Sequence, residues 1–162
     1  MSQPAWWRGT RGEWYVVVQM LLFALVMAGP PTWQGWPGWA LPDSGVIAWA
    51  GGVLLACGAS LAIAGVRRFG HTISALPYPV AEGTLLDTGP YRLVRHPIYS
   101  GAVLVAFGWA CWRHGWLTFG YAALLFLFFD LKARREEQWL LEKFPMYADY
   151  RRRVRKLVPF VY

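Results

Sequence analysis

Cysteine and acidic residues are scarce in this sequence, and each shortage narrows the class of protein. The 162 residues include two cysteines, Cys57 and Cys111, and both lie in apolar stretches, where a thiol is usually a small buried apolar group. This excludes a disulfide framework and a CxxC metal site. Asp and Glu number 9 against 16 Lys and Arg, so the formal net charge is +7. Because the basic residues flank apolar segments and form no stripe between aromatic residues, the charge does not indicate a nucleic-acid partner.

Apolar residues, by contrast, are abundant. They make up 56% of the chain, and the mean hydropathy is +0.29, whereas soluble proteins are roughly 45–50% apolar. The chain also has 11 Trp and 17 Gly. Trp concentrates at membrane interfaces, and Gly is commoner in membrane-spanning helices than in soluble ones. The composition therefore predicts an integral membrane protein.

Four apolar runs predict an all-α, polytopic fold with about four transmembrane helices. Residues 46–66 carry no charge and reach about 32 Å as a helix, enough to span. Residues 14–29 are near the lower limit of length for a helix that crosses a membrane. A cleaved signal peptide is the alternative for that run, but the chain behind it stays hydrophobic and no A-x-A site precedes the prolines that end it. Residues 97–112 and 117–131 are each marginal, so two full crossings and a partly sunk hairpin both fit.

The basic residues predict how the chain is oriented. The loop 30–45 has no Lys or Arg, the turn 113–116 has one, and the rest lie in the N-terminal segment, the loop 67–96 and the tail 132–162. By the positive-inside rule, both termini and the loop 67–96 face the cytoplasm. We expect one membrane domain over residues 1–162, with the loop and a C-terminal juxtamembrane helix on the same side.

The most informative pattern, which we call the motif, lies between residues 89 and 101 and reads Gly-Pro-Tyr-x-x-x-Arg-His-Pro-x-Tyr-x-Gly. Pro97 suits the first position of a helix, where its missing N–H is not needed and its φ is already helical. That places Arg95, His96 and Tyr99 at the cytoplasmic mouth of a membrane helix. The free N–H groups and positive dipole end of such a helix suit an anionic group. Taken singly, each of these residues also fits an interface anchor or a loop.

The combined pattern resembles the signature of the isoprenylcysteine carboxyl methyltransferase and phospholipid methyltransferase families. Those families are helical membrane enzymes that use S-adenosylmethionine. A second stretch is similar to their Glu-Glu tail: Arg135-Glu136-Glu137-x-x-Leu140, then Phe144-x-x-Tyr147-x-x-Tyr150. The resemblance extends from about Gly83 to the C-terminus, and it implies methyl transfer to a lipophilic substrate, with S-adenosylhomocysteine as product.

The resemblance also implies which residues contact the cofactor. They lie in the polar loop, at the start of the third apolar run and after the fourth run: Gly83, Thr84, Leu85, Leu86, Tyr91, His96, Pro97, Ile98, Tyr99 and Glu136. S-Adenosylmethionine presents a sulfonium cation, a zwitterionic amino acid end and an adenine. Its site needs an anion or aromatic faces, a helix N-terminus and an apolar slot, and these residue types supply them. No metal is required.

Helical geometry separates the two adjacent glutamates. Neighbouring residues on a helix point about 100° apart, so Glu136 and Glu137 cannot both face one pocket. Lys132, Glu136, Leu140 and Phe144 recur at four-residue spacing and form one stripe. This favours Glu136 for the cofactor. The alternative is a solvated ion-pair face, in which each pair contributes only about 0.2–0.5 kcal/mol.

The candidate catalytic residues are Arg95, Lys132, Arg135 and Glu137. The resemblance implies a basic residue against the substrate one helical turn before Glu136, where Lys132 stands in place of an arginine, with Arg135 and Arg95 as alternatives. A carboxylate acceptor needs a cation but no base, whereas a phospholipid amine must lose a proton and would require a base such as Glu137. The basic residue favours the carboxylate of an isoprenylcysteine-like or prenylated substrate.

Two alternative functions also fit the sequence. One is a phospholipid amine methyltransferase, and the other is a non-enzymatic membrane protein of the same fold. Asp130 is the one acid well inside an apolar run, so a transporter is poorly supported. The basic residues between 151 and 156 predict an anchor for anionic headgroups at the membrane surface, or a means of gathering an anionic lipid substrate.

Overall fold

Helices form the regular structure of the protein. The computed structural model describes residues 12–36, 44–69 and 85–162, and over these ranges no strand is present beyond an isolated bridge between Val94 and Arg155. The elements are α1 (Glu13–Ala28), α2 (Ser44–Phe69), the 3-10 helix η3 (Gly89–Arg92), α3 (Pro97–Arg113), α4 (Trp116–Lys143) and α5 (Tyr147–Arg153). The predicted all-α fold is confirmed.

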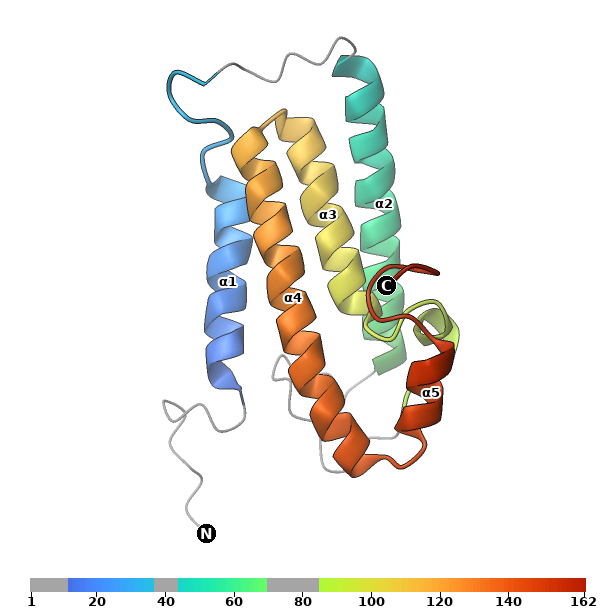
Figure 1. Cartoon of the computed structure of the whole chain (residues 1–162). Helices are drawn as coiled ribbons and strands as arrows, with labels where there is room; N and C mark the ends of the chain where they lie inside the picture. Colours follow the sequence, from blue (N-terminus) through green and yellow to red (C-terminus); the bar gives the residue numbers. More distant parts are fainter. Residues whose placement is uncertain (1–11, 37–43, 70–84) are drawn as a thin grey trace.

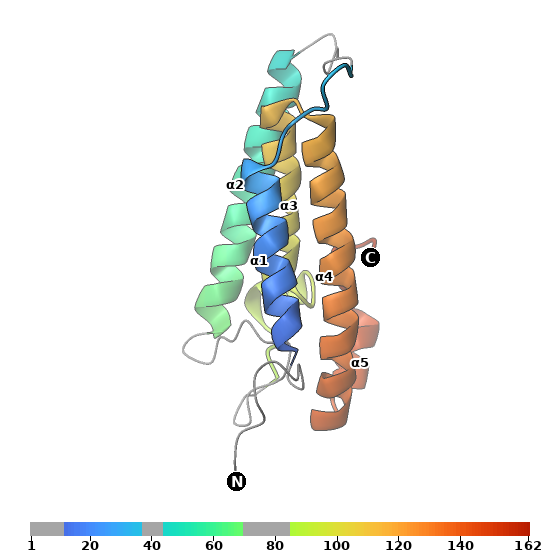
Figure 2. The same cartoon turned by 90° about the vertical axis from the view of Figure 1, so that its left-hand side faces the viewer.

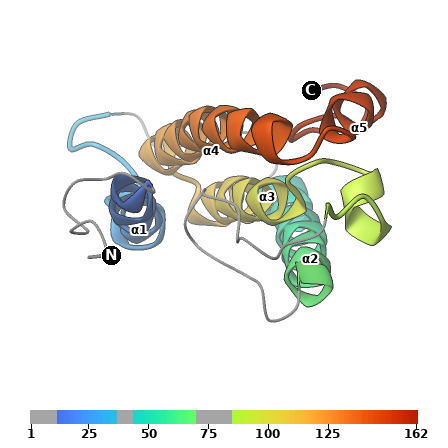
Figure 3. The same ribbon diagram turned by 90° about the horizontal axis from the view of Figure 1, so that it is seen from below.

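The four long helices stand side by side (Figures 1 and 2). Viewed along the bundle, α3 lies beside α2 and α4, and α1 lies against α4 (Figure 3). The core between α1, α3 and α4 is built from Val26, Val103, Ala106, Ala122, Leu125 and Phe129. The chain enters α1, leaves α2, enters α3 and leaves α4 at the same end of the bundle (Figure 1). The motif and the C-terminal part of α4 therefore meet at that end.

Glycines bring α2 and α3 into close contact. A Cβ atom built on Gly58 would lie 2.7 Å from the carbonyl oxygen of Gly101, and one built on Gly108 would lie 2.7 Å from the carbonyl oxygen of Gly51. Small residues let helix backbones approach in this way in membrane proteins. The contact fixes α3, and with it the motif at its N-terminus, against α2.

Within the described residues, two helices are long and apolar enough to cross a membrane, namely Gly45–Phe69 and Trp116–Lys143. The apolar helix α1 is shorter, with 16 residues. Large apolar side chains point outward on the bundle, including Trp49 at 78% exposure and Leu21 at 65%. Such side chains suit a lipid surface. Four crossings and a cytoplasmic position of both termini stay predictions.

The structure differs from the sequence-based expectation beyond residue 131, where the last apolar run ends. No separate juxtamembrane helix begins there, because α4 continues to Lys143. Residues 132–143 are mostly strong helix formers with no Gly or Pro among them, so the backbone stays helical although the hydrophobicity falls. The helix ends just before Pro145, and the short α5 follows.

The C-terminal segment after α4, residues 144–162, which we call the tail from here on, folds back onto the motif. The backbone N–H of Arg95 donates to the carbonyl oxygen of Arg155 (2.8 Å), and that of His96 donates to Lys156 (3.2 Å). Lys156 is buried and donates from Nζ to the carboxylate of Asp130 on α4. The basic run is therefore more than a surface anchor, since part of it is built into the protein.

Candidate functional site

A pocket of about 470 Å³ lies at the end of the bundle where the motif, α4 and α5 meet. We call it the central pocket. Its volume is within the range of about 300–1,000 Å³ that is typical of small-molecule sites. It is lined by Gln19, Phe23, Phe69, Leu85, Leu86, Tyr91, Arg95, His96, Pro97, Ile98, Tyr99, Ala102, Phe129, Lys132, Glu136, Leu140, Phe144, Tyr147 and Tyr150.

Most of the predicted cofactor residues meet in the central pocket. Leu85, Leu86, Tyr91, His96, Pro97, Ile98, Tyr99 and Glu136 line it. Gly83 and Thr84 lie outside the described residues. As predicted, Pro97 occupies the first helical turn of α3, directly after the N-cap residue His96. The predicted stripe of α4 also faces the pocket, since Lys132, Glu136, Leu140 and Phe144 all line it.

A stack of three rings forms one wall of the central pocket. The rings of His96 and Tyr99 lie 5.4 Å apart and nearly parallel, at 1°, and those of Tyr99 and Phe129 lie 4.6 Å apart at 14°. The Tyr99 hydroxyl donates to Oε2 of Glu136 at 2.9 Å. The wall thus combines aromatic faces with a carboxylate, both of which attract cations.

His96 connects the two neighbouring glutamates. Its Nδ1 lies 3.6 Å from Oε2 of Glu136, and its Nε2 lies 3.2 Å from Oε1 of Glu137. The glutamates themselves diverge: Glu136 lines the central pocket, and Glu137 lines a second pocket on the other side of α4. Helical geometry predicts this separation.

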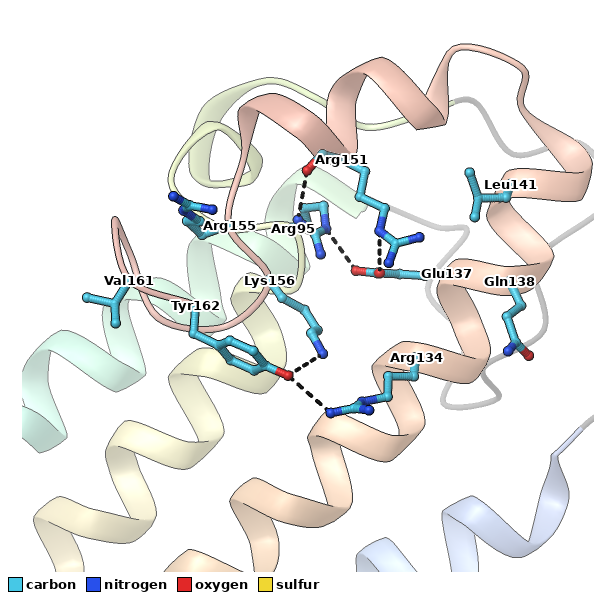
Figure 4. Close-up of a pocket in the computed structure, with 10 residues that line it drawn as sticks. All are labelled: Arg95, Arg134, Glu137, Gln138, Leu141, Arg151, Arg155, Lys156, Val161 and Tyr162. Carbon is cyan, nitrogen blue, oxygen red and sulfur yellow. Dashed lines mark hydrogen bonds and ion pairs between the residues drawn. The ribbon is translucent and has the colours of Figure 1, made fainter.

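The second pocket, which we call the outer pocket, has a volume of about 550 Å³ and lies between α4 and the tail (Figure 4). Its lining is Arg95, Arg134, Glu137, Gln138, Leu141, Arg151, Arg155, Lys156, Val161 and Tyr162. Arg95 lines both pockets.

Glu137 is held by several cations. Nε of Arg95 lies 2.8 Å from its Oε1, and Nε of Arg151 lies 3.4 Å from its Oε2. The side chains of Arg95 and Glu137 are only 7% and 4% exposed. Arg95 also donates to the backbone oxygens of Arg151 and Val154. This carboxylate joins the motif, α4 and the tail, and it does not line the central pocket as a base would.

Lys132 is the basic residue of α4 that the central pocket contains. It is 1% exposed, its Nζ donates to Oε1 of Gln19 at 2.6 Å, and it lies 5.1 Å from the centre of the Tyr99 ring. Arg135 lies elsewhere, because it donates to Gln138 at 3.0 Å and stacks 4.7 Å from the ring centre of Trp139. Of these two candidates for contact with the substrate, the structure brings only Lys132 to the pocket.

Two tyrosines of α5 were not among the predicted site residues. The Tyr150 hydroxyl donates to the backbone oxygen of Tyr91 at 2.7 Å. The Tyr147 hydroxyl is buried without a hydrogen-bond partner in the described part of the chain. Burial raises the pKa of Tyr147 and of Tyr150 well above the usual tyrosine range, so both keep their protons and can donate. The three-residue spacing of Tyr147 and Tyr150 was the sequence feature from which their shared position could have been predicted.

Other parts of the pocket gave no sequence signal. Gln19 and Phe23 come from α1, and Phe69 ends α2, far from the motif along the chain. In residues 12–36, 44–69 and 85–162, no group of three or more His, Cys, Asp or Glu side chains is placed to hold a metal ion.

The apolar helices, and a pocket at one end of the bundle that combines aromatic faces with a carboxylate, agree with an α-helical membrane enzyme of the methyltransferase type. The phospholipid methyltransferase family matches residues 46–147, and the chain belongs to this family. The matched region runs from α2 through the motif to the first residue of α5. The resemblance seen in the sequence is thereby confirmed.

Three curated relatives are similar to this chain over different lengths. The cobalt-zinc-cadmium resistance protein CzcN of Cupriavidus metallidurans is 30% identical over 152 residues, covering 91% of this chain and 62% of that protein. The nickel-cobalt-cadmium resistance protein NccN of Alcaligenes xylosoxydans xylosoxydans is 30% identical over 151 residues, covering 91% and 63%. The steroid 5-alpha-reductase DET2 of Gossypium hirsutum is 34% identical over 74 residues, covering 46% and 28%. The chain thus spans less than two thirds of the length of each relative.

Proposed function

We propose that this protein transfers a methyl group from S-adenosylmethionine to a lipophilic acceptor in the central pocket, and that the acceptor is the carboxylate of an isoprenylcysteine-like molecule. The observation that carries the proposal is the meeting of three groups in one pocket. These are the stacked ring of Tyr99, the carboxylate of Glu136 and the buried ammonium of Lys132. Family membership supports methyl transfer, and the pocket supports the choice of residues.

The pocket has the groups that S-adenosylmethionine requires. A sulfonium cation is attracted by aromatic faces and by an anion. The stack of His96, Tyr99 and Phe129 offers aromatic surface, and Glu136 offers the anion. An amino acid carboxylate suits the first turn of a helix, where N–H groups are free of intrahelical bonds, and α3 begins at Pro97. Leu85 and Leu86 supply apolar surface for the adenine.

A buried hydroxyl supports the presence of a ligand in this pocket. Tyr147 is 1% exposed, and its hydroxyl has no partner within the described residues. Leaving such a group unpaired costs about 1–3 kcal/mol. A polar ligand in the central pocket would accept this hydrogen bond and remove the cost.

Catalysis by this chain would rest on alignment and on the exclusion of water. When bound, S-adenosylmethionine supplies an already activated methyl group, whose bond to sulfur breaks as a bond to the acceptor oxygen forms. Lys132 would orient the acceptor by pairing with its carboxylate. The buried position of Lys132 strengthens that pairing, because little water competes with it.

The position of Glu137 favours a carboxylate acceptor over a phospholipid amine. An amine must lose a proton, which requires a free base beside the acceptor. Glu137 is engaged by Arg95, His96 and Arg151, and it lines the outer pocket. A carboxylate acceptor is already anionic and needs no such base.

The apolar outer surface of the bundle supports a substrate that arrives through the lipid bilayer. We propose a multi-pass protein with both termini and the pocket on the cytoplasmic side, in which the acceptor is a small lipophilic molecule or a prenylated chain end. The basic loop and tail support this orientation by the positive-inside rule.

Calorimetric titration of S-adenosylmethionine into the detergent-purified protein tests the cofactor. We expect saturable binding that Glu136→Ala abolishes and that Tyr99→Phe weakens, because the phenol hydroxyl holds the carboxylate in place. NADPH is the comparison ligand, since a reductase would require a hydride donor. Binding of NADPH without binding of S-adenosylmethionine, in protein shown to be folded, would overturn methyl transfer.

Metal tolerance offers a cellular readout of turnover. The names of two relatives connect those proteins with resistance to cobalt and cadmium, and we propose the same phenotype for this chain. Cells producing the His96→Ala/Glu136→Ala variant should lose any tolerance that the wild type confers. Full tolerance with the variant, at equal protein level, would favour a non-enzymatic membrane protein.

A further inference from the structure

The outer pocket carries an excess of positive charge that methyl transfer does not use. Five of its ten lining residues have basic side chains, and Glu137 has the one acidic side chain among them. Arg151 extends from the tail toward Glu137, and Arg134 reaches from α4 toward Tyr162 across the same hollow (Figure 4). Even after Asp130, which pairs with Arg134 and Lys156 beside the hollow, is counted, cations outnumber acids.

An exposed stripe of α4 leads from the apolar surface into this pocket. Leu124, Leu127 and Leu131 are 50%, 56% and 59% exposed. Continuing along the helix at the same three- and four-residue spacing, Arg134 and Gln138 line the pocket. Residues at this spacing lie on one face, so a single face of α4 is apolar along the bundle and becomes basic at its end.

This arrangement matches the shape and charge of one kind of molecule. An anionic phospholipid has a phosphate that suits arginine forks and acyl chains that suit exposed leucines. We propose that the outer pocket binds the headgroup of an anionic phospholipid whose acyl chains lie along Leu124, Leu127 and Leu131. Arg134 and Arg151 contact the phosphate from the two sides of the pocket.

The lipid is distinct from the methyl acceptor. Tyr99, Lys132 and Glu136 line the central pocket and not the outer one. The lipid instead joins the tail to α4, since Arg151 belongs to α5 and Arg134 to α4. Part of the basic run at residues 151–156 would therefore belong to a defined lipid site, and its role would differ from a diffuse attraction to the membrane surface.

Native mass spectrometry of the full chain in detergent tests the site, with phosphatidylglycerol and phosphatidylcholine of equal chain length as probes. The wild type should retain phosphatidylglycerol in preference. The Arg134→Gln/Arg151→Gln variant should retain about tenfold less, because each basic residue near an anionic lipid contributes to binding. The matched control is Arg152→Gln/Arg153→Gln, which removes the same charge from α5 outside the pocket.

Three outcomes would overturn the proposal. Equal loss in the control would mean that the tail attracts lipid by its overall charge. Equal retention of phosphatidylcholine would mean that the headgroup is not recognised. Displacement of the lipid by millimolar inorganic phosphate would mean a site for a free anion. If the double variant does not fold, lipid retention by the single variant Arg151→Gln tests the proposal. The readout needs no S-adenosylmethionine, so it stands apart from the proposed methyl transfer.

Discussion

At the scale of single residues, the chemistry of the central pocket depends on charged side chains spaced one turn apart on α4. It also depends on one tyrosine of α5. Lys132 and Glu136 face the pocket because they are one helical turn apart on α4. Tyr147, the first residue of α5, adds a buried hydroxyl. A phenol hydroxyl without a partner lowers stability in the free protein and gains a bond when a ligand enters.

Tyr147→Phe should therefore weaken cofactor binding while leaving the fold intact. Removal of a hydroxyl that has no partner among the described residues is expected to leave the melting temperature unchanged or slightly higher. Loss of one hydrogen bond to the ligand should cost about 1 kcal/mol, roughly a fivefold increase in the Kd for S-adenosylmethionine. Calorimetry and thermal unfolding of the same preparations measure both quantities.

Tyr150→Phe is the matched control. It removes a hydroxyl that donates to Tyr91 at 2.7 Å, so it should lower stability by about 1 kcal/mol and change cofactor affinity less. If Tyr147→Phe instead lowers the melting temperature and leaves the affinity unchanged, the hydroxyl serves the fold and not a ligand.

At the scale of the elements, local signals in the sequence were sufficient for some boundaries and not for others. Pro97 predicts the start of α3 because its effect on φ and on hydrogen bonding is local. The length of α4 was missed because hydrophobicity ends at 131 while helix propensity continues to Lys143. Gln19 and Phe69 reach the pocket only through the packing of whole helices, for which the chain carries no local signal.

The contact between α2 and α3 should tolerate no side chain at its glycines. A Cβ on Gly101 would lie 2.5 Å from the carbonyl oxygen of Gly58, a backbone atom that cannot move aside without shifting a helix. We expect Gly101→Val to separate the two helices and to abolish monodisperse protein in detergent, as judged by size-exclusion chromatography.

Gly52→Ala serves as the control for this prediction. Gly52 also lies within α2, but among the described residues no atom outside its own stretch of helix lies within 4 Å of its Cβ position. Because alanine favours a helix over glycine by about 1 kcal/mol, this variant should be as stable as the wild type or more so. Comparable loss of protein in both variants would show that the close contact between α2 and α3 is not the cause.

At the scale of the whole molecule, an ion pair between residues distant in sequence attaches the C-terminal tail to the helical bundle. Asp130 on α4 is the acid that the sequence places inside an apolar run, and Lys156 of the tail pairs with it. Both side chains are 10% exposed. Tyr162 donates to the same carboxylate at 2.8 Å. A buried acid that would be expensive in isolation thus becomes the point at which the tail attaches.

Lys156→Met should destabilise the protein by about 1.5–3 kcal/mol, because the carboxylate of Asp130 loses one of its two cations and keeps only Arg134. Asp130→Leu/Lys156→Met removes both charges and should recover most of that loss, since a buried ion pair replaced by apolar groups is often neutral. Chemical unfolding of the single and double variants completes a cycle that isolates the coupling between the two sites. Simple addition of the two single effects would mean that the tail is held by other contacts. Recovery in the double variant, with cofactor binding restored alongside stability, would mean that the tail matters to the central pocket through its attachment and not through the charge of Lys156.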